Sequence, residues 1–355
     1  MSRGVMGIRA MGGPVSGVTQ MLRMQNGLSI PSLGFGTYRM SADEAGPAVT
    51  YAVECGFRHI DCAKIYLNEG AVGTALASLI SSKKVKREDL FVTSKLWPTD
   101  QHPDHVERAC RESIENLKVG YLDLLLIHWP VVWKHTGSFA TDEDRRPRQS
   151  NGNAMVDTSV TLEDTWRAMT KLVDLGLVKS IGVSNCDGDH IKRIMDVTEE
   201  QKHAAGINQI EFHPACYQSD LRNLNGDYGL LTAAYCPLGM PTRFTPPEFM
   251  GVAKDDSVLK PLVINTGFSP GRLLLNWNLD NGNVVIVKST NKEHIRDNAK
   301  ACRYALGDSV RWLLNHYEDQ LQKSQRVINP VDFLGGEEPT PFFEARVKPM
   351  RIHNP

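Results

Sequence analysis

Four polar residues stand where apolar, strand-like runs of this sequence end. Asp61 and Tyr66 lie in HIDCAKIY, Lys95 in LFVTSKLW and His128 in LDLLLIHWP. A carboxylate, a phenol, an ammonium group and an imidazole at three successive strand ends would meet at the mouth of a barrel, where active sites of that fold lie. Each residue alone has an ordinary structural explanation, such as a cap or a core histidine, but together they predict one proton-donating cluster.

The chemistry of this cluster depends on Tyr66. A phenol with an unperturbed pKa of about 10 is a poor acid at neutral pH unless nearby positive charge stabilises its anion. Lys95 can supply that charge and lower the pKa of Tyr66, while Asp61 keeps Lys95 protonated and oriented. His128 then offers a hydrogen bond to a substrate oxygen.

Composition limits the other functions. The chain has 355 residues, of which 41% are apolar and 23% charged, and a net charge of -1, so we expect no affinity for nucleic acid or membrane. No apolar run approaches the roughly 18 residues of a membrane span. The seven cysteines form no C-x-x-C pair, so we predict neither a metal site nor disulfides and expect a cytoplasmic protein.

Apolar runs alternate with helical patterns from residue 24 onward. We predict strands over 33–38, 57–63, 91–95, 122–128, 180–185, 206–211, 231–236 and 283–288. We predict helices over 43–55, 69–82, 103–117, 162–174, 188–197, 217–225, 269–280 and 291–299. This alternation predicts an α/β fold, either a closed barrel or a doubly wound sheet.

The glycine pattern decides between these folds. A doubly wound dinucleotide fold needs G-x-G-x-x-G, but after Gly34 and Gly36 the third glycine is replaced by Arg39. Polar residues that end strand after strand favour a (β/α)8 TIM barrel instead. Long loops over 131–160 and about 237–260, and the tail after about 325, are expected at its C-terminal face.

The N-terminal region contains a hairpin signal. Asn26-Gly27 between apolar residues predicts a two-residue β-hairpin turn before the barrel. We therefore assign residues 1–23 to an N-terminal extension and 24–355 to one barrel domain that includes the tail. Arginines without acidic residues weakly suggest a targeting segment in 1–23, but a plain extension is favoured because no amphipathic period is evident.

A series of motifs points to a known family. The chain contains, in this order, GFRHIDCAKIYLNE, FVTSKLW, LDLLLIHWP, SIGVSN, NQIEFHP, AYCPLG and VKSTNKEHIRDN. From about residue 24 to 345 it resembles the aldo-keto reductases of the aldose and aldehyde reductase type. The resemblance implies an NADPH-dependent barrel enzyme that reduces an aldehyde or ketone to an alcohol by hydride transfer. It implies Tyr66 as general acid, Asp61 and Lys95 as its tuners and His128 as the residue that orients the carbonyl.

The same resemblance implies a cofactor site. It implies that the nicotinamide and pyrophosphate lie against Gly36, Thr37, Tyr38, Ser184, Asn185, Gln209, Tyr235, Cys236 and Leu238. It implies that the adenosine phosphate end lies against Lys288, Ser289, Thr290, Asn291, His294, Asp297 and Asn298. His294 stands where many members have an arginine, and a neutral imidazole lacks the arginine's bidentate fork, so NADH is possible beside NADPH.

The substrate side and the alternatives complete the prediction. The resemblance implies a substrate wall of Tyr38, Trp97, His128 and Trp129, which suits a small apolar carbonyl compound, and we expect a monomer. One alternative is a nicotinamide-binding regulatory or scaffold subunit on the same barrel with vestigial turnover. A lyase or isomerase would need a substrate-phosphate site and would make no use of the Lys288 motif.

Overall fold

Eight parallel strands close into a barrel in the computed structural model, which describes residues 20–239, 258–301, 305–320, 326 and 328. Their order around the barrel is β10-β3-β4-β5-β6-β7-β8-β9. The strands are β3 (Leu33–Gly36), β4 (His59–Asp61), β5 (Phe91–Leu96), β6 (Leu124–Ile127), β7 (Ile181–Ser184), β8 (Ile207–Glu211), β9 (Leu231–Tyr235) and β10 (Val284–Val287). The predicted (β/α)8 TIM barrel is thereby confirmed.

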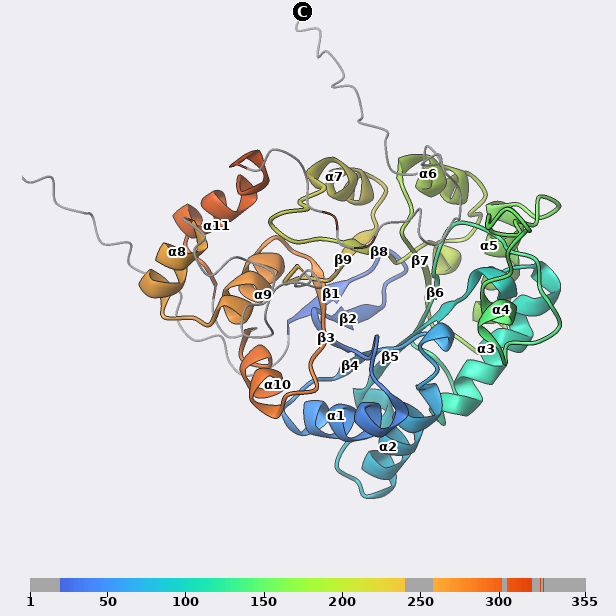
Figure 1. The fold of residues 1–355 in the computed structure, drawn as a ribbon, viewed down its shortest axis with the longest axis horizontal. Coiled ribbons are helices and arrows are strands. Elements are labelled where there is room, and N and C mark those ends of the chain that lie inside the picture. Colours follow the sequence, from blue (N-terminus) through green and yellow to red (C-terminus); the bar gives the residue numbers. More distant parts are fainter. Residues whose placement is uncertain (1–19, 240–257, 302–304, 321–325, 327, 329–355) are drawn as a thin grey trace, which may run out of the picture.

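The helices surround the strands on the outside of the barrel (Figure 1). Those that follow the strands are α1 (Ala42–Glu54), α2 (Glu69–Ser81), α3 (Pro103–Leu117), α5 (Leu162–Asp174), α6 (Gly188–Asp196), α7 (Ser219–Asp227), α9 (Pro270–Asp280) and α10 (Lys292–Asn298). The sequence prediction missed α4 (Asp142–Arg145), α8 (Leu259–Thr266) and α11 (Asp308–Asn315). In the described part of the chain, no helix combines the length and apolar character that crossing a membrane requires.

Helix α5 illustrates why these segments are helical. Thr161 caps its N-terminus in a capping box with Asp164, which satisfies backbone N–H groups that the first turn would otherwise leave unpaired. Trp166, Met169 and Leu172 recur every three residues on one face and are buried. The helix therefore has a defined start and a single apolar stripe that packs in the core.

The strand register places the predicted site residues at one end of the barrel. Gly36 at the end of β3 pairs with Asp61 at the end of β4, and Asp61 pairs with Thr93 of β5. The strands are buried along almost their whole length, as expected for a parallel sheet covered on both faces. Polar side chains at the carboxyl ends of these short strands therefore lie close together.

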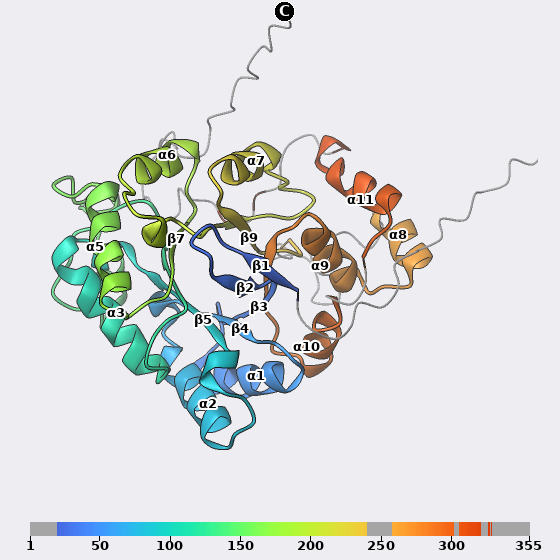
Figure 2. The same ribbon diagram turned by 180° about the vertical axis from the view of Figure 1, so that it is seen from behind.

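An antiparallel hairpin, β1 (Met21–Arg23) and β2 (Ser29–Pro31), closes the opposite end of the barrel, as Figure 2 shows from behind. Its residues Met24 and Ile30 are buried in one apolar cluster with strand residues such as Leu124 and Ile286. Asn26 Nδ2 donates to Ser180 Oγ at 2.8 Å, just before β7 begins. The barrel is thus sealed at its base, and its mouth lies at the carboxyl ends of the strands.

The turn of this hairpin differs from the prediction. The N–H of Met24 donates to the carbonyl of Leu28 at 2.8 Å, and the N–H of Gly27 donates to the carbonyl of Met24 at 3.0 Å. Gly27 has a φ of 88°, so the turn is a three-residue loop with a left-handed glycine rather than the predicted two-residue turn. Strand β1 also begins inside the segment 1–23 that we assigned to the extension. The rest of that segment before residue 20, much of the loop 237–260 and most of the tail lie outside the described residues.

Candidate active site

Lys95 joins three of the four predicted cluster residues. Its Nζ donates to Asp61 Oδ1 at 2.5 Å, to the carbonyl oxygen of Cys62 at 2.9 Å and to the hydroxyl oxygen of Tyr66 at 3.3 Å. The ring of His128 lies edge-on to that of Tyr66, with 5.8 Å between the ring centroids. The structure therefore brings the four side chains together at the mouth of the barrel.

Asp61 has hydrogen bonds to all of its oxygens. Its Oδ2 accepts from Gln209 Nε2 at 2.9 Å, and its backbone carbonyl accepts from the N–H and the Oγ1 of Thr37 at 3.1 and 3.0 Å. Asp61 and Lys95 are 2% and 1% exposed. A buried ion pair is tolerated only when its remaining donors and acceptors are satisfied, and these contacts satisfy them.

The electrostatic environment of Tyr66 differs from the prediction. Burial of the hydroxyl raises the pKa of Tyr66 well above its ordinary value of 10.0, and the charge of Asp61 raises it further. The expected lowering of this pKa is therefore not found, because burial disfavours the charged phenolate. Tyr66 keeps part of its surface exposed at the mouth, so the phenol is both protonated and accessible.

His128 is held neutral. Burial lowers the pKa of His128 well below 6.5, and the positive charge of Lys95 lowers it further. A neutral imidazole carries one N–H donor and one acceptor nitrogen. The site thus combines a protonated phenol and an uncharged imidazole with a buried ion pair.

A second hydrogen-bonded chain follows β7, β8 and β9. Asn185 Nδ2 donates to the carbonyl of His128 at 2.9 Å, and Asn185 Oδ1 accepts from the hydroxyl of Tyr235 at 2.8 Å. Ser184 Oγ donates to the carbonyl of Gln209 at 2.8 Å. Asn185 has a φ of 58°, a left-handed conformation that asparagine tolerates better than most residues. The predicted nicotinamide residues therefore form one connected set next to the cluster.

The predicted residues of β3 and the loop after β9 border the same mouth. The ring of Tyr38 lies 5.0 Å from that of Tyr66, measured between centroids. At Gly36 an added Cβ would lie 2.9 Å from Ile286 Cγ2, so glycine is required there for close packing. Cys236 has a φ of 47° and accepts at its carbonyl from the N–H of Gly239, which forms a tight turn around the buried Leu238.

The far end of the predicted cofactor site is exposed. Lys288, Thr290 and His294 are exposed after β10, unlike the buried cluster. Asn291 caps α10, because its Oδ1 accepts from the N–H groups of Glu293 and His294 at 2.8 and 3.2 Å. The side chain of Asn291 therefore keeps only its amide donors for a ligand.

Ser289, Asp297 and Asn298 complete that end. Ser289 Oγ accepts from the backbone N–H of Asn291 at 3.1 Å. Asp297 is already bonded to Ser269 and to Arg272, while Asn298 is buried. The predicted contact of Asp297 with adenine would compete with these two partners.

A cluster of tryptophans lies next to His128. Trp97, Trp129 and Trp133 are buried in one cluster, and Ile328 of the tail packs against it. The ring of Trp97 lies 5.2 Å from that of His128, and its indole N–H donates to the carbonyl of Arg145 at 2.7 Å. Sequence analysis named Trp97 and Trp129 as wall residues; it did not name Trp133, which lies in the long loop 131–160, four residues after Trp129.

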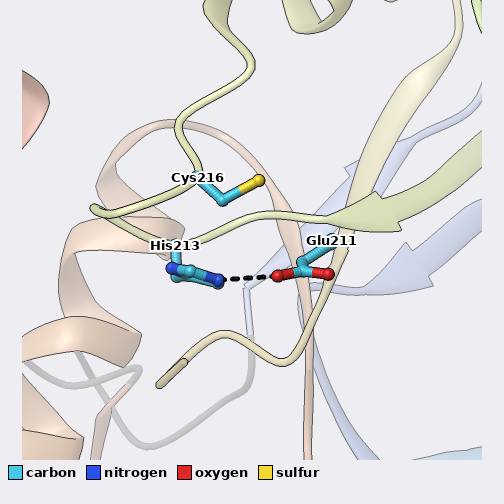
Figure 3. Close-up of side chains that lie close together, drawn as sticks. All are labelled: Glu211, His213 and Cys216. Carbon is cyan, nitrogen blue, oxygen red and sulfur yellow. Dashed lines mark hydrogen bonds and ion pairs between the residues drawn. The ribbon is translucent and has the colours of Figure 1, made fainter. Parts of the chain in front are cut away.

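Among the described residues, one group has the side chains and spacing of a metal site: Glu211, His213 and Cys216 (Figure 3). All three are buried, and their ligand atoms lie within 4.8 Å of one another. Glu211 Oε1 already pairs with His213 Nε2 at 2.9 Å, and its Oε2 accepts from the N–H of Ile328 at 2.9 Å. The carboxylate thus joins β8 to the tail, and a metal ion would have to displace these contacts.

Comparisons with known proteins identify the family of this chain. Residues 32–311 match the Aldo/keto reductase family. Aldo-keto reductase family 1 member A1-A of Danio rerio is 36% identical over 324 residues, which cover 90% of this chain and 95% of the relative. The structure of the aldose reductase from Schistosoma japonicum superposes with a TM-score of 0.78 and 37% identity, covering 90% and 97% of the two chains.

A third comparison includes a cofactor. The structure of Bombyx mori aldo-keto reductase in complex with NADP has a TM-score of 0.76 and 32% identity to this chain, and the match covers 89% and 96% of the two chains. With a family match over most of its length, this chain belongs to the aldo/keto reductase family.

Proposed function

We propose that this protein is an NADPH-dependent oxidoreductase that reduces an aldehyde or ketone to an alcohol, with Tyr66 as the general acid. The observation that carries the proposal is the contact of Lys95 Nζ with the hydroxyl of Tyr66 at 3.3 Å while the same ammonium group is paired with Asp61. A proton donor beside a fixed positive charge is what a carbonyl oxygen needs as it becomes an alkoxide.

NADPH, when bound, supplies the hydride. Tyr66 is protonated at neutral pH and donates its phenolic proton to the carbonyl oxygen as that oxygen gains negative charge. Lys95 donates a hydrogen bond that stabilises the phenolate left behind, and the ion pair with Asp61 holds the ammonium group in position. His128, held neutral by burial, donates to the carbonyl oxygen and orients it.

The residues of the chain fit this cofactor. Ser184, Asn185 and Gln209 offer hydroxyl and amide groups suited to a carboxamide, and Tyr235 offers an aromatic face. Gly36 at the end of β3, with Thr37 and Tyr38 directly after it, borders the expected nicotinamide position. The turn after β9 places Cys236 and Leu238 at the same end of the barrel.

The exposed ammonium group of Lys288, with Ser289, Thr290 and Asn291, suits the 2′-phosphate of NADPH. His294 in place of an arginine weakens that contact, so NADH is a possible second cofactor. We assign Asn298 and Asp297 to the adenine. For Asp297, this contact would compete with its bonds to Ser269 and Arg272.

The substrate wall suits an apolar carbonyl compound. Tyr38 is partly exposed, Trp97 and Trp129 are aromatic side chains buried at the same end of the barrel, and His128 is the polar group among them. Ligand pockets of this kind are mostly apolar with a few placed donors. The alternative of a regulatory subunit with vestigial turnover has no specific support, since all four cluster residues are in place.

The test compares the protein with Tyr66→Phe. Purified protein is assayed for NADPH consumption with a panel of aromatic and aliphatic aldehydes, and the variant should lose about 10²-fold or more in turnover. NADPH affinity, measured by cofactor fluorescence, should stay unchanged, because the substitution removes only the hydroxyl. Wild-type turnover in the Tyr66→Phe protein would refute the role of Tyr66, and NADPH binding without any turnover of the wild-type protein would favour the regulatory alternative.

A further inference from the structure

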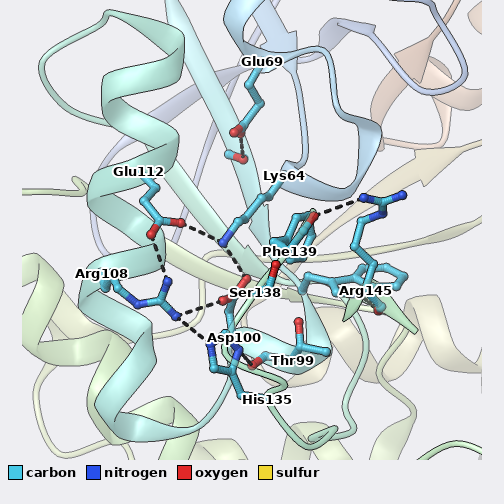
Figure 4. A network of polar contacts seen from close by, with 12 residues as sticks. Lys64, Glu69, Thr99, Asp100, Arg108, Glu112, His135, Ser138, Phe139 and Arg145 are labelled. Atoms are coloured by element: carbon cyan, nitrogen blue, oxygen red, sulfur yellow. Dashed lines mark hydrogen bonds and ion pairs between the residues drawn. The ribbon is translucent and has the colours of Figure 1, made fainter. Parts of the chain in front are cut away.

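Lys64 stands two residues before Tyr66 and has no role in the chemistry above. It begins the short 3-10 turn Lys64–Tyr66, and its side chain is only 10% exposed. Its Nζ pairs with Asp100 Oδ2 at 3.0 Å and with Glu112 Oε2 at 2.8 Å (Figure 4). Asp100 follows the end of β5, and Glu112 lies on α3, so this one ammonium group fastens the turn to two neighbouring elements.

The same ammonium group also contacts the long loop between β6 and α5. Lys64 Nζ lies 4.5 Å from the centroid of the ring of Phe139. The carbonyl of Phe139 accepts from Arg145 Nη1 at 3.0 Å, and the carbonyl of Arg145 accepts from the indole of Trp97 at 2.7 Å. The loop is thus held on one side by Lys64 and on the other by a residue of the predicted substrate wall.

The acidic partners explain why Lys64 is needed at this place. Asp100 is fully buried, and beside Lys64 its nearest ion-pair partner in the described part of the chain is Arg108, at the longer distance of 3.6 Å. Glu112 is shared, because Arg108 Nη1 also donates to it at 2.9 Å. Without Lys64, the buried carboxylate of Asp100 would keep only the weaker contact, and the local arrangement would have to change.

Any such change would reach Tyr66 directly. The N–H of Tyr66 donates to the carbonyl of Ala63 at 3.0 Å, and the N–H of Leu67 donates to the carbonyl of Lys64 at 3.1 Å. Ile65, between Lys64 and Tyr66, packs against the tryptophan cluster. The position of Tyr66 is therefore tied to that of Lys64 through the backbone of one short turn.

We propose that Lys64 is a positioning residue, which holds the turn that carries Tyr66 and the loop that carries Phe139 in one common arrangement. One buried ammonium group then fixes both the position of the Tyr66 hydroxyl and the position of the loop at the mouth. This inference rests on the proposed role of Tyr66 as general acid.

The test begins with Lys64→Met, which keeps the length of the side chain and removes its charge. Because a misplacement of about 1 Å can cost about 10²-fold in rate, we expect kcat to fall at least about tenfold, with NADPH affinity unchanged within about twofold. With NADPH deuterated at the transferred hydrogen, the isotope effect on kcat should rise, since the chemical step becomes slower. Lys64→Arg, which retains the charge, should recover most of the loss.

The matched control is Lys84→Met, which removes an exposed ion pair with Glu54 of 2.7 Å. It should leave kcat and the isotope effect unchanged. A Lys64→Met protein that is less stable but keeps the kcat and isotope effect of the control would overturn the inference, because Lys64 would then be merely structural.

Two milder variants cover the case in which Lys64→Met does not fold. Glu112→Gln weakens one ion pair at a partly exposed carboxylate, and Phe139→Leu removes only the aromatic contact. We expect Glu112→Gln to lower kcat about threefold and Phe139→Leu to raise KM for bulky aldehydes, since the loop is less firmly seated. Wild-type kinetics in both variants would overturn the inference.

Tyr66→Phe, assayed in parallel, separates the two proposals. If Tyr66→Phe is inactive and the Lys64 series behaves as wild type, only the positioning role fails. If Tyr66→Phe retains full activity, the proposed general acid fails, whatever the Lys64 variants show.

Discussion

The buried imidazole of His59 should make the stability of the protein depend on pH. His59 is 1% exposed inside the barrel, and its Nε2 lies 3.0 Å from Thr93 Oγ1. Burial lowers the pKa of His59 from 6.5 to about 4. Above pH 6.5 the residue is neutral in both the folded and the unfolded chain, so it adds no pH dependence there. Below pH 6.5 the unfolded chain binds a proton that the folded chain does not, so stability is lost as the pH falls.

The size of this loss follows from the two pKa values of His59. The pKa of His59 is 6.5 in the unfolded chain and about 4 in the folded protein. This difference lowers the free energy of unfolding by about 2 kcal/mol at pH 5 and about 3 kcal/mol at pH 4, relative to pH 7.5. Below pH 4 the folded protein binds the proton as well, and the contribution levels off. The other titrating groups add their own effects, which a comparison between two proteins removes.

The assay is urea denaturation of the wild-type protein and of His59→Gln across pH 7.5 to 4.5. Glutamine can keep a hydrogen bond to Thr93 but does not titrate. Between pH 7.5 and 5, the wild-type protein should lose about 2 kcal/mol more free energy of unfolding than the variant does. Parallel pH profiles would refute the reasoning, because they would mean that His59 is protonated equally in both states.

Three further outcomes are expected. Asp61→Asn leaves Lys95 buried without its carboxylate and should lower the free energy of unfolding by about 3–5 kcal/mol in urea denaturation; a loss within the range of about 0–1 kcal/mol typical of exposed pairs would contradict the burial of the pair. Gly34→Ala places a Cβ 2.7 Å from His59 Nδ1 and should cost about 1–3 kcal/mol, whereas an unchanged urea midpoint would show that the neighbours yield freely. His294→Arg should tighten NADPH binding about tenfold in a fluorescence titration and leave NADH unchanged; equal tightening of both would remove His294 from the 2′-phosphate site.

The meeting of Asp61, Lys95 and His128 could be predicted because it follows from topology. Each residue ends an apolar run, and a closed parallel barrel brings all strand ends to one edge. Neither the loop conformations nor the side-chain rotamers were needed for that step. The period of the apolar residues and the residue type at each strand end were sufficient.

The partners of these residues could not be predicted in the same way. Gln209 donates to Asp61 across 148 positions of sequence, and Lys64 pairs with Glu112 across 48, and no local pattern encodes such pairs. The pKa of Tyr66 depends on its burial and on the nearby charge of Asp61, neither of which sequence order specifies.

The hairpin turn was mispredicted for a related reason. The side chain of Asn26 is bound by Ser180, far along the chain, so its local preference does not act alone. Tertiary contacts thus decided a feature that short-range turn rules were expected to determine.

The hairpin at the base of the barrel also imposes an order on the folding of the chain. The hairpin is synthesised before the barrel strands, yet Ile30 is buried in one cluster with Leu124, Ile207 and Ile286, the last of which is made about 250 residues later. The pairing of β3 with β10 likewise joins the two ends of the barrel sequence. Base closure and barrel closure therefore both depend on contacts that are distant in the sequence, and such contacts form slowly during folding. A chain truncated before β10 exposes the apolar face of the hairpin together with two unpaired strand edges, and it should aggregate rather than persist as a partial barrel.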